Sequence, residues 1–107
     1  MELRHLRYFL SVADELNFTR AAEKLFIAQP SLSQQIKDLE DELGAPLFVR
    51  QKPALKLTEE GTQFYTDAKH IIELALKAKQ NVKFISNNKK KIINIGFLPV
   101  AEMKIFP

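Results

Sequence analysis

Five uncharged polar side chains lie within seven consecutive residues: Gln29, Ser31, Ser33, Gln34 and Gln35. Amide and hydroxyl groups both donate and accept hydrogen bonds, so they can pair with base edges in the major groove of DNA. There an amide suits adenine, and a hydroxyl suits a base or a phosphate. Exposed helix faces in small domains are polar as well, so this composition leaves both base recognition and simple solvation open.

The surrounding sequence predicts two short helices joined by a tight turn between residues 17 and 43. Each helix has an apolar stripe at helical spacing. The stripes consist of Phe18, Ala21, Ala22, Leu25 and Phe26 in the first helix, and of Leu32, Ile36, Leu39 and Leu43 in the second. Asn17 is a good N-cap for the first helix, and Pro30 suits the first turn of the second. The pair is typical of a helix-turn-helix, whose second helix reads DNA.

Charge is segregated along the second helix. Its acidic residues lie toward the C-terminal end, at Asp38, Glu40, Asp41 and Glu42. Because carboxylates repel phosphate, only the N-terminal end is expected to face DNA. Neighbouring elements supply positive charge at Arg20, Lys24, Arg50, Lys52 and Lys56. The formal net charge of +3 is too small to indicate nucleic-acid binding by itself, so this local arrangement carries the argument.

The flanking segments complete a small domain. An apolar stripe predicts a first helix over about residues 2–14, where Arg4 is equally consistent with a phosphate contact and with solvated charge. Gly44 is expected to end the third helix. The side chains of residues 47–57 alternate along the chain on both sides of a turn, which predicts a β-hairpin. A hairpin after a helix-turn-helix is the wing of a winged-helix fold. Arg50 and Lys52 lie at or near its tip, where cations suit phosphates or a narrow minor groove.

A long helix follows, capped by Thr58 and extending to about Ile85. Its apolar residues recur in steps of four and three, which is a heptad seam. The seam consists of Phe64, Ala68, Ile71, Ala75, Ala78, Val82 and Ile85, widened by Ile72 and Leu76. At 1.5 Å per residue this helix is ~40 Å long, more than the preceding domain can cover. The seam therefore predicts antiparallel or crossed pairing with a second copy of the chain.

Residues 87–91 are polar and predict a solvated hinge, and residues 92–100 predict a strand. The chain has no cysteine, which fits a reducing cytoplasm and argues against disulfides. No apolar run reaches the length of a membrane span. His5 and His70 have no convincing ligand or catalytic partners in the sequence, so neither an enzyme activity nor a metal or other cofactor is expected.

Three blocks of sequence resemble the N-terminal region of LysR-type transcriptional regulators. They are MELRHLRYFLSVADELNFTRAAEKL, IAQPSLSQQIKDLEDELGAPLFVR and LKLTEEGTQFY, and the likeness is continuous from Met1 to about residue 66. Its order, spacing and residue types make it highly specific. Many relatives carry arginine at the position of Gln34, so a charged base contact is not expected there.

The resemblance implies a mainly α fold: a winged helix-turn-helix (three helices plus a β-hairpin wing) followed by a long dimerising linker helix. It implies a DNA-binding domain at residues 1–58, the linker helix at 59–88, and the truncated start of an effector-binding domain at 89–107. It further implies a homodimer on an inverted-repeat operator and, for a full-length protein, a homotetramer that responds to a small-molecule inducer. The opening block looks most like that of regulators of aromatic-compound catabolism.

Twelve residues are the predicted DNA contacts: Arg4, Thr19, Arg20, Gln29, Pro30, Ser31, Ser33, Gln34, Gln35, Lys37, Arg50 and Lys52. The alternative function is a protein-interaction module, because winged helices and coiled coils also mediate assembly. DNA binding with a steep dependence on salt would separate the two hypotheses.

Overall fold

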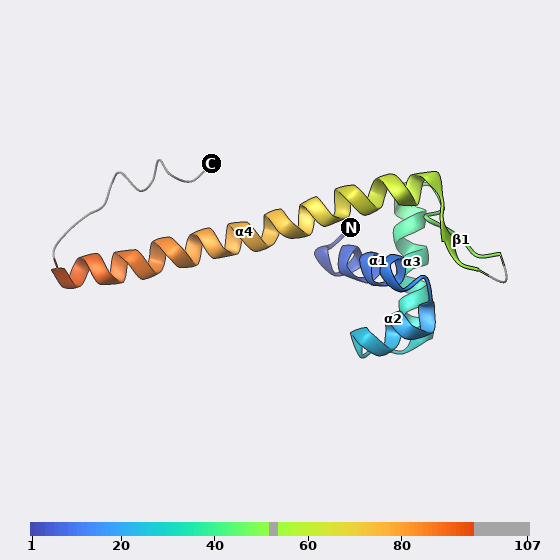
Figure 1. The fold of residues 1–107 in the computed structure, drawn as a ribbon, viewed down its shortest axis with the longest axis horizontal. Coiled ribbons are helices and arrows are strands. Elements are labelled where there is room, and N and C mark those ends of the chain that lie inside the picture. Colours follow the sequence, from blue (N-terminus) through green and yellow to red (C-terminus); the bar gives the residue numbers. More distant parts are fainter. Residues whose placement is uncertain (52–53, 96–107) are drawn as a thin grey trace. The chain divides into compact units, whose positions relative to one another are not determined.

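The computed structural model describes residues 1–51 and 54–95, and the side chains of this part as far as residue 89. Three helices come first: α1 (Leu3–Glu15), α2 (Phe18–Leu25) and α3 (Gln29–Leu43). A hairpin of β1 (Phe48–Val49) and β2 (Lys56–Leu57) and a long helix, α4 (Glu59–Ile95), follow. Residues 1–72 form one compact unit, and the remainder of α4 belongs to a second. The fold is therefore the predicted winged helix-turn-helix followed by a long helix (Figure 1).

Local signals set the helix ends as the sequence predicts. The Asn17 side chain accepts a hydrogen bond from the backbone N–H of Arg20 at 2.9 Å and so caps α2. Gly44 ends α3 in the left-handed conformation, with φ at +79°. Thr58 caps α4 by accepting from the Gly61 N–H at 2.9 Å, and its hydroxyl donates to the Pro46 carbonyl at 2.7 Å.

The core of the first unit joins α1, α2 and α3 to the hairpin and the start of α4. Its buried residues include Leu6 and Phe9 of α1, and Leu32 and Ile36 of α3. An aromatic cluster links these elements: the Phe9 ring lies 5.4 Å from that of Phe48 and 5.0 Å from that of Phe64, between centroids. Such ring pairs stabilise beyond the area they bury. The hairpin is antiparallel, with Phe48 opposite Leu57 and Val49 opposite Lys56.

Two residues of the apolar stripes predicted for the helix-turn-helix are not in the core. Phe26 is 93% exposed, because it follows α2 in the left-handed conformation, with φ at +57°, and its side chain turns away from the stripe. Leu43, in the last turn of α3, is 40% exposed.

The long helix also differs from expectation. It continues through Asn87–Lys91, so the predicted hinge is wrong. Residues 92–95 are helical instead of extended, and the rest of the predicted strand lies outside the described residues. Asparagine and lysine are tolerated in helices, and without a glycine or proline this polar run does not end one.

Candidate nucleic-acid interface

The first two turns of α3 carry the polar side chains that the sequence singled out. Gln29, Pro30, Ser31 and Gln34 are exposed, whereas Ser33 and Gln35 are half-buried. The amide of Gln29 donates to the Ser33 hydroxyl at 2.9 Å. Residues four apart share a helix face, so these two groups form one hydrogen-bonding surface. The predicted cluster is thus present, with most of its groups open to solvent.

Two of these glutamines differ in how their polar atoms are satisfied. The amide of Gln34 donates to the Asp38 carboxylate at 2.8 Å, which leaves its carbonyl oxygen to accept from another group. The side-chain oxygen of Gln35 is buried without a hydrogen-bond partner. Burying an unpaired acceptor is costly. The side chain of Gln35 is thus half-buried with its oxygen unpaired, whereas the side chain of Gln34 is exposed to solvent.

The predicted contacts outside the polar cluster differ in their surroundings. Arg4 and Lys37 are exposed and already near acids: Arg4 lies 3.9 Å from Glu2, and Lys37 lies 3.9 Å from Asp41. Such exposed pairs are weak and are readily exchanged for another anion. Thr19 and Arg20 are exposed in the first turn of α2. Lys52 lies outside the described residues.

Arg50 is not a freely solvated residue of the hairpin tip. It follows β1 directly, and its Nη2 donates to a carboxylate oxygen of Glu40 at 3.0 Å. Glu40 itself, one of the acids toward the C-terminal end of α3, is not solvated like a surface acid. It is only 8% exposed, because its carboxylate turns inward to bind the backbone of the hairpin. Its place among three other acids gave no sign of this in the sequence.

A hollow of about 400 Å³ lies between the start of α2, the start of α3 and the hairpin. Its polar lining consists of Asn17, Gln29, Ser33, Arg50 and Gln51. Among the described residues that line it there is one cation and no carboxylate, so the hollow suits an anionic group such as a phosphate.

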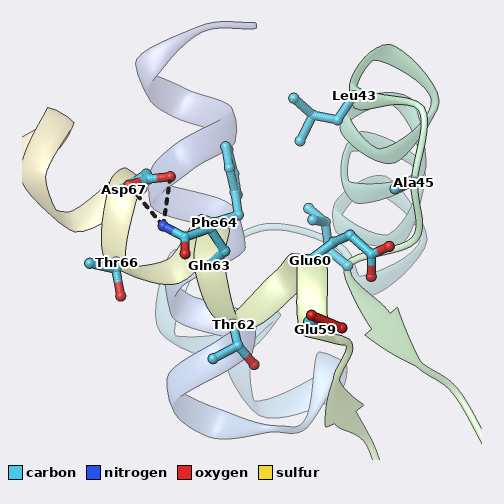
Figure 2. Close-up of a pocket in the computed structure, with 10 residues that line it drawn as sticks. Leu43, Ala45, Glu59, Glu60, Thr62, Gln63, Phe64, Thr66 and Asp67 are labelled. Carbon is cyan, nitrogen blue, oxygen red and sulfur yellow. Dashed lines mark hydrogen bonds between the residues drawn. The ribbon is translucent and has the colours of Figure 1, made fainter.

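A second, larger groove of about 820 Å³ lies between the end of α3 and the first turns of α4 (Figure 2). Leu43, Leu47 and Phe64 contribute apolar surface, and the acids among its lining residues are Glu59, Glu60 and Asp67. The Gln63 amide donates to both oxygens of Asp67 at 3.3 Å, as Figure 2 shows. An acidic groove repels phosphate, so the candidate DNA face is the other hollow.

The predicted seam of α4 divides into two parts. Phe64 and Ile72 are half-buried against the core of their own domain, and Ala68 is fully buried in it. This part was expected to meet a second copy, and in the structure it packs on its own domain. Other seam residues are more exposed, with Ile71 at 38% and Val82 at 67%.

Exposure also separates the remaining seam residues. Ala75 and Ile85 are half-buried, whereas Ala78 is exposed. Leu74 was absent from the predicted seam, yet it is 68% exposed, and it lies three residues from Ile71 and four from Ala78. This helical spacing was the available signal for including it.

Among the described residues, no cluster of three or more histidine, cysteine, aspartate or glutamate side chains could hold a metal ion. In the same part of the chain, no helix is long and apolar enough to cross a membrane.

Comparison with known proteins agrees with this geometry. Residues 3–62 match the model of the bacterial regulatory helix-turn-helix proteins of the lysR family. The Hca operon transcriptional activator HcaR of Escherichia coli is 52% identical over all 107 residues, which cover 36% of its length. CatR of Pseudomonas putida is 49% identical over the same span, again 36% of its length. The chain thus spans about a third of these two relatives. BudR of Klebsiella aerogenes is 50% identical over 96 residues, or 90% of this chain and 67% of that protein.

Solved structures of similar sequence have the same fold. The BenM DNA-binding domain in complex with catB site 1 DNA superposes with a TM-score of 0.77 at 48% identity, covering 80% of this chain and 97% of that one. Full-length CbnR with its target DNA superposes with a TM-score of 0.74 at 37% identity, covering 78% of this chain and 29% of that one.

Proposed function

Because this chain belongs to the lysR family of bacterial regulatory helix-turn-helix proteins, we propose that it binds double-stranded DNA sequence-specifically, as part of a bacterial transcription regulator. The observation that carries the proposal is the exposed polar surface at the start of α3, beside a hollow that Arg50 lines. Solved relatives of 48% identity were crystallised on DNA, which supports DNA binding by this chain. Such a protein works in the cytoplasm, where bacterial DNA is found.

The side chains divide by chemistry into base readers and phosphate contacts. Gln29, Ser33 and Gln34 are assigned to base edges, because amides and hydroxyls match the donor and acceptor pattern of the major groove. Arg4, Thr19, Arg20, Pro30, Ser31, Gln35 and Lys37, with Arg50 and Lys52 of the hairpin, are assigned to the backbone or the groove walls. Phosphate contacts position the protein, and base contacts specify the sequence.

Two copies are proposed to pair through the exposed apolar stripe of α4, which includes Ile71, Leu74 and Val82. Charge supports an antiparallel arrangement. Residues 59–73 carry four acids and one lysine, whereas residues 74–95 carry lysines and no acid. An antiparallel pair brings the acidic half of one helix beside the basic half of the other, and a parallel pair opposes like charges. A twofold dimer presents two α3 helices to successive major grooves, so the operator is an inverted repeat.

The functions of a longer protein remain predictions. The chain spans about a third of HcaR and of CatR. A homotetramer, a small-molecule inducer and a role in aromatic-compound catabolism are therefore expectations from the resemblance of the sequence. The absence of enzyme activity is likewise an expectation from the sequence.

Selection of binding sites from random duplex DNA is the direct test of the proposal. We expect an inverted repeat, with affinity that falls steeply as salt rises because bound phosphates release counterions. Failure to enrich any sequence, with stable assembly in the absence of DNA, would favour the protein-interaction module instead.

Base reading has a matched control within the chain. Gln34 donates to Asp38, and Gln63 donates to Asp67 in the same i, i+4 arrangement on α4. Gln34→Ala should relax base preference at one or two positions by roughly 1–3 kcal/mol. Gln63→Ala should leave base preference as it is. Equal effects of the two variants would show that Gln34 does not read bases.

Pairing through α4 is tested by adding one charge to the stripe. Leu74→Asp would bury an unpaired carboxylate in the proposed interface, so sedimentation should show a monomer. The control is Gln80→Asp, which introduces the same group at another exposed position of α4. A Leu74→Asp protein that remains dimeric would place the interface elsewhere.

A further inference from the structure

Glu40 is a buried acid on the helix proposed to read DNA. One of its carboxylate oxygens accepts hydrogen bonds from the backbone N–H groups of Leu47 and Phe48, at 2.6 and 3.3 Å. The other accepts from Arg50 at 3.0 Å. A single side chain of α3 thus binds three donors of the segment that forms β1 and the start of the hairpin loop. Glu40 therefore links the hairpin to α3.

Arg50 is held from two sides. Glu40 binds one of its terminal nitrogens, and the guanidinium carbon lies 5.4 Å from the centre of the Phe18 ring, at the start of α2. That ring in turn packs against Phe48, with centroids 5.8 Å apart. A guanidinium has five N–H donors in a fixed plane, so an acid that binds one edge also orients the others. Arg50 is 45% exposed, whereas the Glu40 side chain is 9% exposed.

We propose that Glu40 is a positioning residue for DNA binding: with Phe18, it holds Arg50 in the hollow beside α3, where Arg50 binds a backbone phosphate. This inference rests on the proposed DNA-binding function and deepens it. The hollow adds neutral donors from Asn17, Gln29 and Ser33, and among the described residues that line it there is no carboxylate. Glu40 does not touch DNA itself, because its oxygens are buried and already occupied by protein donors.

The two possible roles of Glu40 predict opposite signs. If Glu40 merely neutralises Arg50, removing its negative charge strengthens DNA binding. If it positions Arg50, removing the charge weakens binding, because a loosely held side chain loses conformational freedom when it meets the phosphate. The sign of one substitution therefore separates the roles.

The experiment measures DNA affinity against salt for the wild type, Glu40→Gln, Arg50→Gln and the double variant, on the duplex selected by the wild type. Arg50→Gln should weaken binding about tenfold, as for one lost charge-assisted hydrogen bond. It should also reduce the salt slope by about one. Glu40→Gln keeps the size of the side chain and one acceptor, and should weaken binding several-fold despite the lost negative charge. In the Glu40→Gln background, Arg50→Gln should cost much less than it does alone.

The matched control is Glu23→Gln, the same chemical change at an exposed position of α2. We expect unchanged or slightly tighter binding from it. Circular dichroism reports whether each variant is folded. Should Glu40→Gln unfold, Phe18→Leu removes the ring beneath Arg50 and keeps an apolar side chain, and it should likewise reduce the cost of Arg50→Gln.

The outcomes distinguish this inference from the function on which it rests. Tighter binding by Glu40→Gln, or additive effects of the two substitutions, would overturn the positioning role and leave DNA binding standing. Lack of DNA binding by the wild-type chain would overturn both.

Discussion

Gly61 lies in the first turn of α4, where a side chain has no room. A Cβ atom at this position would lie 2.0 Å from the Leu47 carbonyl oxygen and 3.1 Å from a methyl carbon of Leu57. That carbonyl accepts the backbone N–H of Thr58 at 3.0 Å, which ties the start of α4 to the hairpin. Helix propensity alone predicts that Gly61→Ala stabilises the protein, whereas this close approach predicts the reverse.

The magnitude follows from three contributions. Real Cβ contacts stay above 3.0 Å, so the backbones must separate by about 1.0 Å. Overpacking of this kind costs roughly 1–3 kcal/mol. Weakening of the bond from Thr58 to Leu47 adds about 1 kcal/mol. Alanine in place of glycine returns about 1 kcal/mol through helix propensity. The net expectation is a loss of roughly 1–3 kcal/mol in the free energy of unfolding.

Urea denaturation at a fixed protein concentration measures this loss, because association would otherwise shift the apparent stability. The control is Gln63→Ala, an exposed substitution in the same part of α4. It should change the free energy of unfolding by no more than about 0.5 kcal/mol. A Gly61→Ala protein as stable as the wild type would show that α4 does not approach Leu47 this closely.

Three further substitutions test local features of the first unit. Asn17→Ala removes the cap of α2 and should cost about 1 kcal/mol by thermal unfolding. Phe26→Ser should leave stability nearly unchanged, because that ring is 93% exposed; a large loss would mean that it packs on another surface. The hydrogen bond from Tyr65 to Asp14, and secondarily burial, raise the pKa of Tyr65 above its ordinary value of 10.0. Its stabilising contribution is therefore complete below pH 10 and is lost as pH rises through the raised pKa. Tyr65→Phe should remove that alkaline loss, and an unchanged pH profile would contradict it.

Much of the fold could be read from local signals along the chain. As helix caps, Asn17, Gly44 and Thr58 act on backbone groups within a few residues of themselves, so these effects can be predicted from the sequence. Apolar spacing placed α1, α2 and α3, and the polar cluster at residues 29–35 placed the candidate interface. These features depend on helical periodicity, which packing against other elements does not alter.

Contacts between distant segments decided the rest. Glu40 is one of four nearby acids in the sequence, and only the approach of the hairpin makes it a buried acceptor. Arg50 is a wing cation by position, yet Glu40 and Phe18 determine where its guanidinium lies. Gly61 is unremarkable in a helix until the Leu47 carbonyl approaches it. Periodicity shows which residues share a face of α4, but packing determines which part of that face its own domain covers and which part stays exposed.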